Sequence, residues 1–440
     1  MPAPIPHRVS VAGGLAQGSD APVASCVEEI VERAPELLDV ARAHGSPLYL
    51  LEPDVLRQRA RRFAEAFAAV LPDVRIYYAL KSNNLEAVTR TFVEAGLGID
   101  VSSGLELQQA LAAGCRDIIF SGPGKTAAEL DAAIDAAGEV IVLLDSFGEL
   151  ERLQERAAAR GVRMRAGARL STHECGLWRK FGVPLDQLAR LLDAAGRCSH
   201  VRLEGLQYHM SWLLQPDRQV AFIRDLGAVL ARLPAAQRGA IRFLDIGGGF
   251  WPPEGEWLHA DPEAMLAGGE RGVGDGVGRR GPPPAPRILP ATGIDEFAAA
   301  IAAALQEHVL AHIDCRIHVE PGRWLCSDAM HILITVVDKK ADDLVIADAG
   351  TNALGWERFE SDYFPLVNLT RPGLTERACT VFGSLCTPHD VWGFSVHGAG
   401  IEAGDVLLVP RQGAYTYSLR QRFIKPLPEV VTRGLGGWAR

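Results

Sequence analysis

The arrangement of apolar and polar positions changes twice along the chain. Residues 27–43 carry apolar side chains at helical spacing. From residue 47 onward, short apolar runs alternate with longer stretches rich in Ala and Leu, which is typical of strand–helix units around a parallel sheet. After residue 323 the apolar runs follow one another without long helical stretches. The pattern therefore predicts an α/β domain followed by an all-β domain.

The alternating region predicts eight barrel strands after a first helix at 55–70. The predicted strands are 75–80, 98–101, 117–121, 140–145, 163–170, 201–209, 241–246 and 316–320. The predicted helices between them are 85–95, 105–113, 126–137, 147–160, 185–195, 220–233 and 294–312. Eight such units favour a (β/α)₈ TIM-like barrel, whose functional groups lie at the carboxyl ends of its strands.

These patterns also set the expected domain boundaries. We predict an N-terminal tail and helix at 1–46, the barrel at 47–323 and a C-terminal β domain at 324–440. Strands are expected in the β domain at 332–337, 344–348, 380–383 and 406–409. A Gly- and Pro-rich insertion at 251–293 buries little apolar surface, which predicts a mobile surface segment in preference to a lid.

Composition narrows the class of protein. The chain has 440 residues, of which 48% are hydrophobic and 22% charged, as in soluble globular proteins. Its net charge of −9 argues against a nucleic-acid or anionic-membrane partner. No apolar run is long enough to cross a membrane, and the amino terminus lacks the apolar core of a secretory signal. The eight cysteines show no metal-ligand spacing, so we expect no metal site and a cytoplasmic protein with mostly reduced thiols.

A single lysine ends the first predicted barrel strand. Lys81 follows the apolar run 74–80 and precedes polar turn residues. A lysine at the mouth of a buried strand loses hydration, which lowers its pKa, and a neutral amine can form a Schiff base with a carbonyl compound. The alternative is a surface lysine that closes a strand.

Two other strand ends carry groups suited to an anion. The run Asp245-Ile-Gly-Gly-Gly brings backbone N–H groups together, as phosphate sites require. Glu320-Pro-Gly-Arg323 places a guanidinium, which can bind phosphate in a bidentate manner, beside a carboxylate. The alternatives are a tight turn and a surface ion pair. Four other candidate site residues could also have purely structural roles. These are His209 as a core histidine, Asp100 as a helix cap, Cys386 as a buried thiol and Tyr415 as a packed aromatic residue.

Taken in order, these motifs resemble those of the fold-type III pyridoxal-phosphate decarboxylases, which include ornithine and diaminopimelate decarboxylases. The resemblance extends from about residue 47 to 419. Its motifs are Tyr-Ala-Leu-Lys at Lys81, Asp-Val-Ser-Ser at Asp100, Lys-Phe-Gly at Lys180, His209, Asp-Ile-Gly-Gly-Gly-Phe at Asp245, Glu-Pro-Gly-Arg at Glu320, Asp-Ala-Gly at Asp348, the cysteine motif at Cys386 and Gly-Ala-Tyr at Tyr415.

The resemblance implies a role for each residue around pyridoxal 5'-phosphate. Lys81 would hold the cofactor as a Schiff base, and His209 would lie against its ring. Glu320 would keep the pyridine nitrogen protonated, so that the ring accepts the electrons left by CO₂. Cys386 would help protonate the resulting carbanion. The phosphate would be bound by Gly248, Gly249, Gly322, Arg323 and Tyr415, and the pocket lined by Asp100 and Arg169.

The sequence departs from the family pattern in two places. The family has His-x-Gly-Ser where this chain has His209-Met-Ser211-Trp212, so either Ser211 takes over the phosphate contact or that contact is lost, and Trp212 narrows or reshapes the pocket. Ornithine and diaminopimelate decarboxylases have an acid after the cysteine, where this chain has Thr387. A neutral hydroxyl does not match a cationic substrate group. We therefore expect an amino-acid conjugate of a siderophore or other secondary pathway to be a better substrate than a free basic amino acid.

The resemblance also implies a homodimer with shared active sites. Cys386 of the β domain would reach the neighbouring barrel, with Thr387 and Asp390 on the substrate side, and Lys180 would pair with Asp390 across the interface. Two alternatives remain. One is a racemase of the related barrel fold, although related racemases place an arginine at the ring nitrogen. The other is a non-catalytic relative that binds a partner protein.

Overall fold

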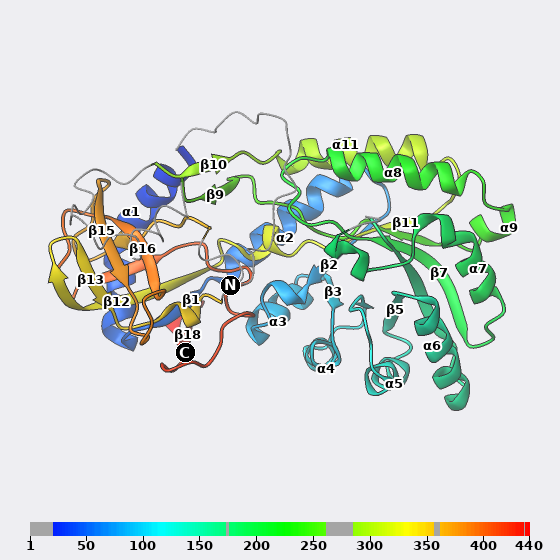
Figure 1. Ribbon diagram of the computed structural model, residues 1–440, viewed down its shortest axis with the longest axis horizontal. Helices are drawn as coiled ribbons and strands as arrows, with labels where there is room; N and C mark the ends of the chain where they lie inside the picture. The colour runs from blue at the N-terminus through cyan, green and yellow to red at the C-terminus, as the bar shows by residue number, and fades with distance from the viewer. Residues whose placement is uncertain (1–20, 173–175, 261–284, 356–360, 435) are drawn as a thin grey trace.

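The molecule is elongated, with a barrel at one end and a β domain at the other (Figure 1). The computed structural model describes residues 21–172, 176–260, 285–355, 361–434 and 436–440. No helix within these ranges has the length and apolar character needed to span a membrane.

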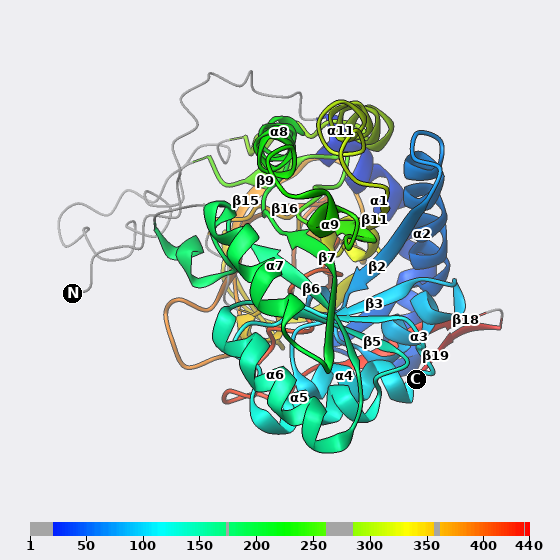
Figure 2. The ribbon, with the colours of Figure 1, turned by 90° about the vertical axis from the view of Figure 1, so that its right-hand side faces the viewer.

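Eight parallel strands close the barrel in the order β11-β2-β3-β4-β5-β6-β7-β8. They are β2 (Val74–Ala79), β3 (Gly98–Val101), β4 (Ile118–Phe120), β5 (Val140–Leu144), β6 (Met164–Leu170), β7 (Val201–Tyr208), β8 (Phe243–Asp245) and β11 (Arg316–Val319). All eight predicted barrel strands are confirmed. Figure 2 shows the helices arranged as a ring around these strands.

The helices around the barrel form where an apolar stripe meets local start and stop signals. They are α2 (Pro53–Ala68), α3 (Glu86–Glu94), α4 (Gly104–Ala112), α5 (Ala127–Asp135), α6 (Phe147–Arg160), α7 (Leu188–Gly196), α8 (Asp217–Leu230), α9 (Ala235–Arg238) and α11 (Ile294–His308). In α6, the Ser146 hydroxyl accepts a hydrogen bond from Glu149 N at the start, and Gly161 ends the helix with a left-handed φ of 64°.

The barrel interior changes from aromatic to polar along its axis. Near the amino-terminal end of the barrel, the His318 ring stacks on Phe243 at 4.6 Å, with the Tyr77 ring 5.0 Å away. In the register of three adjacent strands, His318 is opposite Asp245, and Asp245 is opposite Gln207. Beyond this layer, the carboxyl ends of the strands carry the polar residues identified in the sequence. The aromatic layer thus supports the candidate site from below.

The buried imidazole of His318 predicts an acid-sensitive fold. Burial lowers the pKa of His318 to about 3, from 6.5. Between these values the unfolded chain takes up a proton that the folded chain does not, so His318 costs increasing stability as pH falls from 6.5 toward 3. We expect His318→Phe, which retains the ring stacking, to reduce the pH slope of the unfolding free energy in this window by up to about 1.4 kcal/mol per pH unit. Denaturant unfolding across this pH range measures it, and an unchanged slope would show that His318 is not the sensitive group.

The β domain contains a nine-stranded sheet, of which six strands close on themselves. This ring runs β13-β15-β16-β14-β17-β12 and closes through a β12–β13 pairing. The strands are β12 (Met330–Ala341), β13 (Leu344–Ala347), β14 (Val367–Asn368), β15 (Glu376–Phe382), β16 (Val391–His397) and β17 (Val406–Val409). The four strands predicted for this domain are confirmed, as β12, β13, β15 and β17. The sequence pattern missed β14 and β16 of this ring, and also the later strands β18 (Glu429–Gly434) and β19 (Gly437–Ala439).

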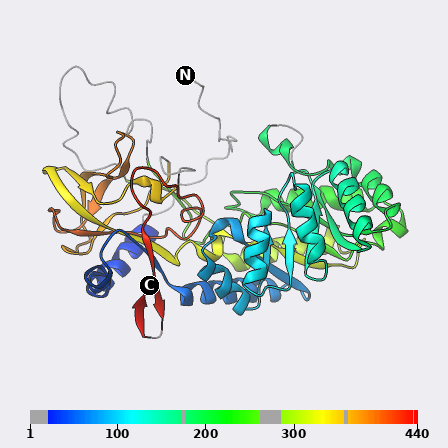
Figure 3. The ribbon, with the colours of Figure 1, turned by 90° about the horizontal axis from the view of Figure 1, so that it is seen from below.

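The expected boundary at residue 47 is wrong. Strand β1 (Leu48–Leu51) pairs antiparallel with β12 and parallel with β18 (Glu429–Gly434), so it belongs to the β domain. Helix α1 (Ala21–His44) buries its apolar stripe in a hydrophobic cluster that also contains Leu48 and Leu50 of β1. Figure 3 shows the hairpin of β18 and β19 (Gly437–Ala439) projecting from this domain. A short apolar run fits either sheet, and only its pairing partners decide between them.

The ends of the predicted insertion are ordered. Strands β9 (Glu256–Leu258) and β10 (Arg287–Leu289) form an antiparallel pair. Glu254 accepts hydrogen bonds from Arg59 of the barrel and Arg411 of the β domain, at 2.8 and 2.9 Å. The prediction of a mobile segment therefore fails at both ends, because these residues bridge the two domains. Its centre, 261–284, lies outside the described residues.

Candidate active site

A cavity of about 360 Å³ opens at the carboxyl ends of the barrel strands. Eight of the residues singled out in the sequence line it: Lys81, Arg169, His209, Gly249, Glu320, Gly322, Arg323 and Tyr415. Two more of the singled-out residues contact the lining: Asp100 contacts Lys81, and Gly248 contacts His209. The structure therefore brings together residues that span more than 330 positions of sequence.

Lys81 is held by a buried carboxylate. It lies in the 3-10 turn η1 (Leu80–Ser82) directly after β2, and its Nζ donates a hydrogen bond to Asp100 Oδ2 at 2.9 Å. Asp100 is fully buried, and its other oxygen accepts from the Ser121 hydroxyl. Burial disfavours the ammonium, but the charges of Asp100 and Glu320 outweigh it and raise the pKa of Lys81 above its usual value. The expectation of a lowered pKa is thus wrong for this state of the protein. Asp100 is placed to take the proton that Lys81 must lose before it reacts.

His209 presents a neutral ring to the cavity. Its Nδ1 accepts a hydrogen bond from Gly248 N at 3.2 Å, which leaves no proton on that nitrogen. Burial, followed by the charges of Lys81 and Arg169, lowers the pKa of His209 well below its usual value. The 3.4 Å approach of Glu320 Oε2 to the same nitrogen is therefore a contact with a neutral ring and not an ion pair.

Glu320 is the one acid among the described residues that line this cavity. It follows β11, is 1% exposed, and lies 3.4 Å from Gln207 Nε2 through each of its oxygens. Both hydrogen bonds from Gln207 are therefore long, and Glu320 lines the cavity. It can therefore accept a proton or a hydrogen bond from a bound group.

Glycine backbone and one arginine form a cradle for an anion. At Gly249, φ is 91° and an added Cβ would lie 2.1 Å from Met210 O. At Gly322, an added Cβ would lie 1.9 Å from Ser82 Oγ. Arg323 lies between two aromatic faces, with Cζ 4.5 Å from the Trp251 ring and 5.0 Å from the Tyr415 ring. Only glycine permits such a close approach of the backbone, and the stacked guanidinium adds a fixed positive charge.

Arg169 forms the wall opposite this cradle. Its Nη1 donates to Ser121 O at 3.3 Å, its Nε lies 3.9 Å from Asp145 Oδ1, and its Cζ lies 4.4 Å from the Phe181 ring. Asp145 in turn accepts from Gly182 N at 3.1 Å. Arg169 thus connects the ends of β4, β5 and β6 and lines the cavity.

This donor set fits pyridoxal phosphate. The amine of Lys81 suits the aldehyde, the carboxylate of Glu320 suits a protonated ring nitrogen, and the glycine cradle with Arg323 suits the phosphate. The cradle is the decisive feature, because Gly249, Gly322 and Arg323 line the cavity together, and a side chain at either glycine would collide with neighbouring protein atoms.

The cysteine motif is part of the β domain and does not line this cavity. Cys386 is exposed and Thr387 is half-buried in the loop after β15. Asp390 is 1% exposed; its Oδ1 accepts hydrogen bonds from Thr351 N and Oγ1 at 2.7 and 2.9 Å, and its Oδ2 accepts from Leu385 N at 2.6 Å. These bonds brace the loop inside its own chain, which disfavours the predicted ion pair with Lys180 of the partner subunit. A direct contact of Thr387 or Asp390 with substrate remains a prediction.

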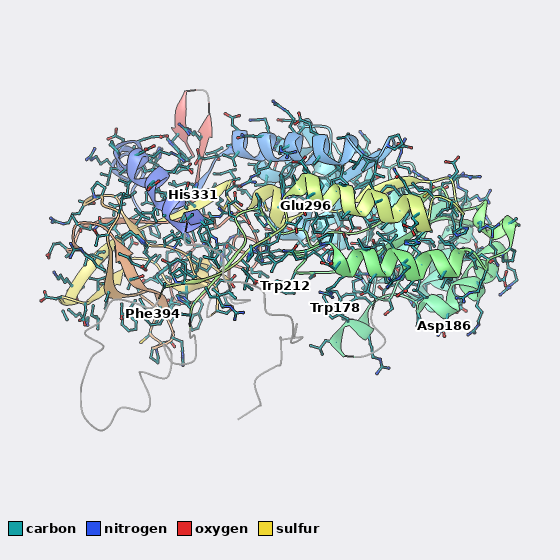
Figure 4. The ribbon with its side chains drawn as sticks, turned by 90° about the horizontal axis from the view of Figure 1, so that it is seen from above. Trp178, Asp186, Trp212, Glu296, His331 and Phe394 are labelled. Atoms are coloured by element: carbon teal, nitrogen blue, oxygen red, sulfur yellow. The ribbon has the colours of Figure 1, made fainter. Side chains whose placement is uncertain are left out.

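Several residues of the cavity were not identified in the sequence. Trp178 of the 3-10 helix η2 (Leu177–Lys180) is one of them, and it lines the cavity together with Phe181 of the Lys-Phe-Gly motif. Trp212, expected to reshape the pocket, does line it, with φ of 54° and 41% of its surface exposed. Figure 4 shows Trp178 and Trp212 at the same edge of the molecule. Gln207 was also missed, although its spacing of two from His209, which directly follows the same strand, was a usable signal.

Comparison with known proteins agrees with this geometry. Residues 54–327 match the family model described as the pyridoxal-dependent decarboxylase, pyridoxal binding domain. The diaminopimelate decarboxylase of Aquifex aeolicus is 26% identical over 409 residues, which cover 88% of this chain and 86% of that protein. An L-glutamyl-[BtrI acyl-carrier protein] decarboxylase of Niallia circulans is 25% identical over 416 residues, covering 87% of each. The crystal structure of diaminopimelate decarboxylase from M. jannaschii in complex with L-lysine shares the fold, with a TM-score of 0.75 and 22% sequence identity. The match covers 91% of this chain and 90% of that one.

Proposed function

We propose that this chain, which belongs to the pyridoxal-dependent decarboxylase family, acts on an amino acid whose distal end is neutral and extended, such as an amide- or carrier-linked conjugate. Family membership makes the protein a pyridoxal-dependent carboxy-lyase. The matched relatives are decarboxylases, which sets aside the racemase and the non-catalytic binding protein.

The observation that carries the substrate class is the charge of the cavity. Among the described residues that line it, Glu320 is the one acid, and the ring nitrogen is its proposed partner. A free basic amino acid would bring a distal ammonium into a site that already holds Lys81, Arg169 and Arg323. A desolvated cation without a carboxylate is costly. An uncharged extension avoids that cost, and one relative is named for a glutamyl group on an acyl-carrier protein.

The aromatic residues that line the cavity support the same substrate class. Trp178, Phe181 and Trp212 offer broad faces on which an extended uncharged chain can pack. Trp212 replaces the serine of the family motif and holds a left-handed backbone conformation, which is uncommon for a bulky residue. Strain of this kind is retained at functional positions more often than elsewhere.

The roles of the other residues follow from their contacts. Lys81 would hold the cofactor aldehyde, and Asp100 would take the proton that Lys81 loses. Glu320 would keep the ring nitrogen protonated, and Gly249, Gly322 and Arg323 would hold the phosphate. When bound, the cofactor would accept the electrons that remain on the substrate after CO₂ leaves.

Cys386 completes the site from a second copy of the chain. The thiol is exposed in this chain and lies outside the lining of its own cavity, so a homodimer is needed for it to deliver a proton to the substrate α-carbon. A free thiol in this role fits the cytoplasmic location expected from the sequence.

A substrate panel tests the proposal. We expect kcat/KM for amide- or thioester-linked amino acids to exceed that for free ornithine, lysine and diaminopimelate by at least about tenfold, because an unpaired buried charge costs more than 1 kcal/mol. CO₂ release measures each rate. Trp212→Ser should lower the rate for conjugates, whereas Thr387→Asp should raise the rate for diamine-type substrates. Efficient turnover of a free basic amino acid by the wild-type protein would refute the neutral-end substrate.

A further inference from the structure

Asp245 is a buried acid beneath Glu320 that the proposed mechanism does not use. It ends β8 inside the barrel and is fully buried. Its Oδ1 accepts a hydrogen bond from Gly247 N at 2.8 Å. Its Oδ2 is buried and has no hydrogen-bond partner within the part of the chain that the structure describes. A lone carboxylate oxygen in such a place is costly, whereas a carboxylic acid could donate from it.

Glu320 is the neighbour that such a proton would reach. The backbone of Glu320 bonds to the same turn, through N to Gly247 O at 2.8 Å. Burial first, and then the charge and side-chain hydrogen bonding of Glu320, raise the pKa of Asp245 well above its usual value. Two carboxylates in contact in a dry site do not both ionise, so one of them keeps a proton.

The surrounding charges decide which acid keeps the proton. The titratable groups around the pair are Tyr77, Lys81, Asp100, Tyr208, His209 and His318. Lys81 is the cation of this set, and Asp100 already binds it at 2.9 Å. His209 and His318 are neutral because burial lowers the pKa of each. Glu320 lines the cavity while Asp245 does not, and the raised pKa belongs to Asp245, so Asp245 is the acid that keeps the proton.

We infer that Asp245 is a protonated carboxylic acid which donates a hydrogen bond from Oδ2 to Glu320, and so keeps Glu320 ionised and directed at the ring nitrogen. Asp245 is a positioning residue, since it acts through Glu320 and touches neither cofactor nor substrate. The inference rests on the proposed placement of Glu320 beside the ring nitrogen.

Two substitutions separate a neutral donor from a carboxylate. Asp245→Asn retains a neutral donor and an acceptor for Gly247 N, so kcat should stay within about threefold of wild type. Asp245→Leu removes the donor, and kcat should fall by about tenfold to a hundredfold, the usual effect of losing a hydrogen bond to a charged group. The pH dependence of the absorbance of the bound cofactor should shift in the leucine variant and not in the asparagine variant.

Infrared difference spectroscopy of the full chain without cofactor independently tests whether Asp245 is protonated. At neutral pH the wild-type protein should show the carbonyl band of a protonated carboxylic acid, which Asp245→Asn removes. Asp117→Asn is the matched control, because Asp117 has its own ion pair with Arg75 at 2.7 Å. A band that persists in Asp245→Asn, or a loss of kcat in Asp245→Asn as large as in Asp245→Leu, would overturn the inference.

The two arms also separate this inference from the proposed function. Loss of the band in Asp245→Asn, without a spectral shift in Asp245→Leu, would mean that Glu320 does not face the ring nitrogen. That result would refute both the placement of Glu320 beside the ring nitrogen and the effect of Asp245 on the cofactor. The conclusion that Asp245 is protonated would still hold. If Asp245→Leu does not fold, the asparagine variant still decides between a neutral and an ionised Asp245.

Discussion

Replacing Lys81 with alanine should abolish covalent attachment of pyridoxal phosphate and lower decarboxylase activity by at least about a thousandfold, the scale on which catalytic groups act. Lys81 is held by Asp100 and is the one lysine among the described residues that line the cavity, so none of them can replace its amine. Borohydride reduction of the wild-type protein, followed by peptide mapping, should place the cofactor on the peptide that contains Lys81. Absorbance and CO₂ release measure the two losses in the variant.

Lys340→Ala is the control for this experiment, because Lys340 is exposed on β12, in the β domain. It should retain both the label and the activity. We expect Lys81→Ala to remain folded, since Asp100 keeps its hydrogen bond from Ser121 after it loses the ammonium of Lys81. Labelling of a different lysine in the wild-type protein would refute the assignment of Lys81.

Mixing two inactive variants should restore activity if the active sites are shared between subunits. Lys81→Ala damages the barrel side of a site, and Cys386→Ala damages the side supplied by the β domain. In a mixed dimer one site carries both changes and the other carries neither. Random exchange of equal amounts should therefore recover about a quarter of wild-type activity.

The measurement is CO₂ release after subunit exchange, with heterodimers identified by a tag on one variant. Mixing Lys81→Ala with Glu320→Ala is the matched control. Both of these residues line the cavity of the same barrel, so every site of that mixed dimer keeps one lesion. No recovery in the first mixture, once heterodimers are demonstrated, would place Cys386 outside the partner's site. Its proposed role in protonation would then fail as well.

The sequence by itself determined the barrel and most of the candidate site. The eight barrel strands could be identified because each is a short apolar run followed by a helix, and this alternation is a local property of the chain. The residues at the strand ends could be identified because parallel strands present their carboxyl ends at one face of a barrel. Lys81, His209, Glu320 and Arg323 meet in the cavity for that reason.

Only the tertiary structure decided features that depend on partners distant in the sequence. Strand β1 joined the β domain because β12 and β18 pair with it, although its own pattern fits either sheet. The pKa of Lys81 rises because folding places Asp100 and Glu320 around it, and their charges outweigh the burial that the sequence suggested. Asp390 turned inward to brace its own loop through Thr351 and Leu385. In each case the deciding contact joins segments that no local pattern relates, so electrostatics and pairing in three dimensions set the outcome.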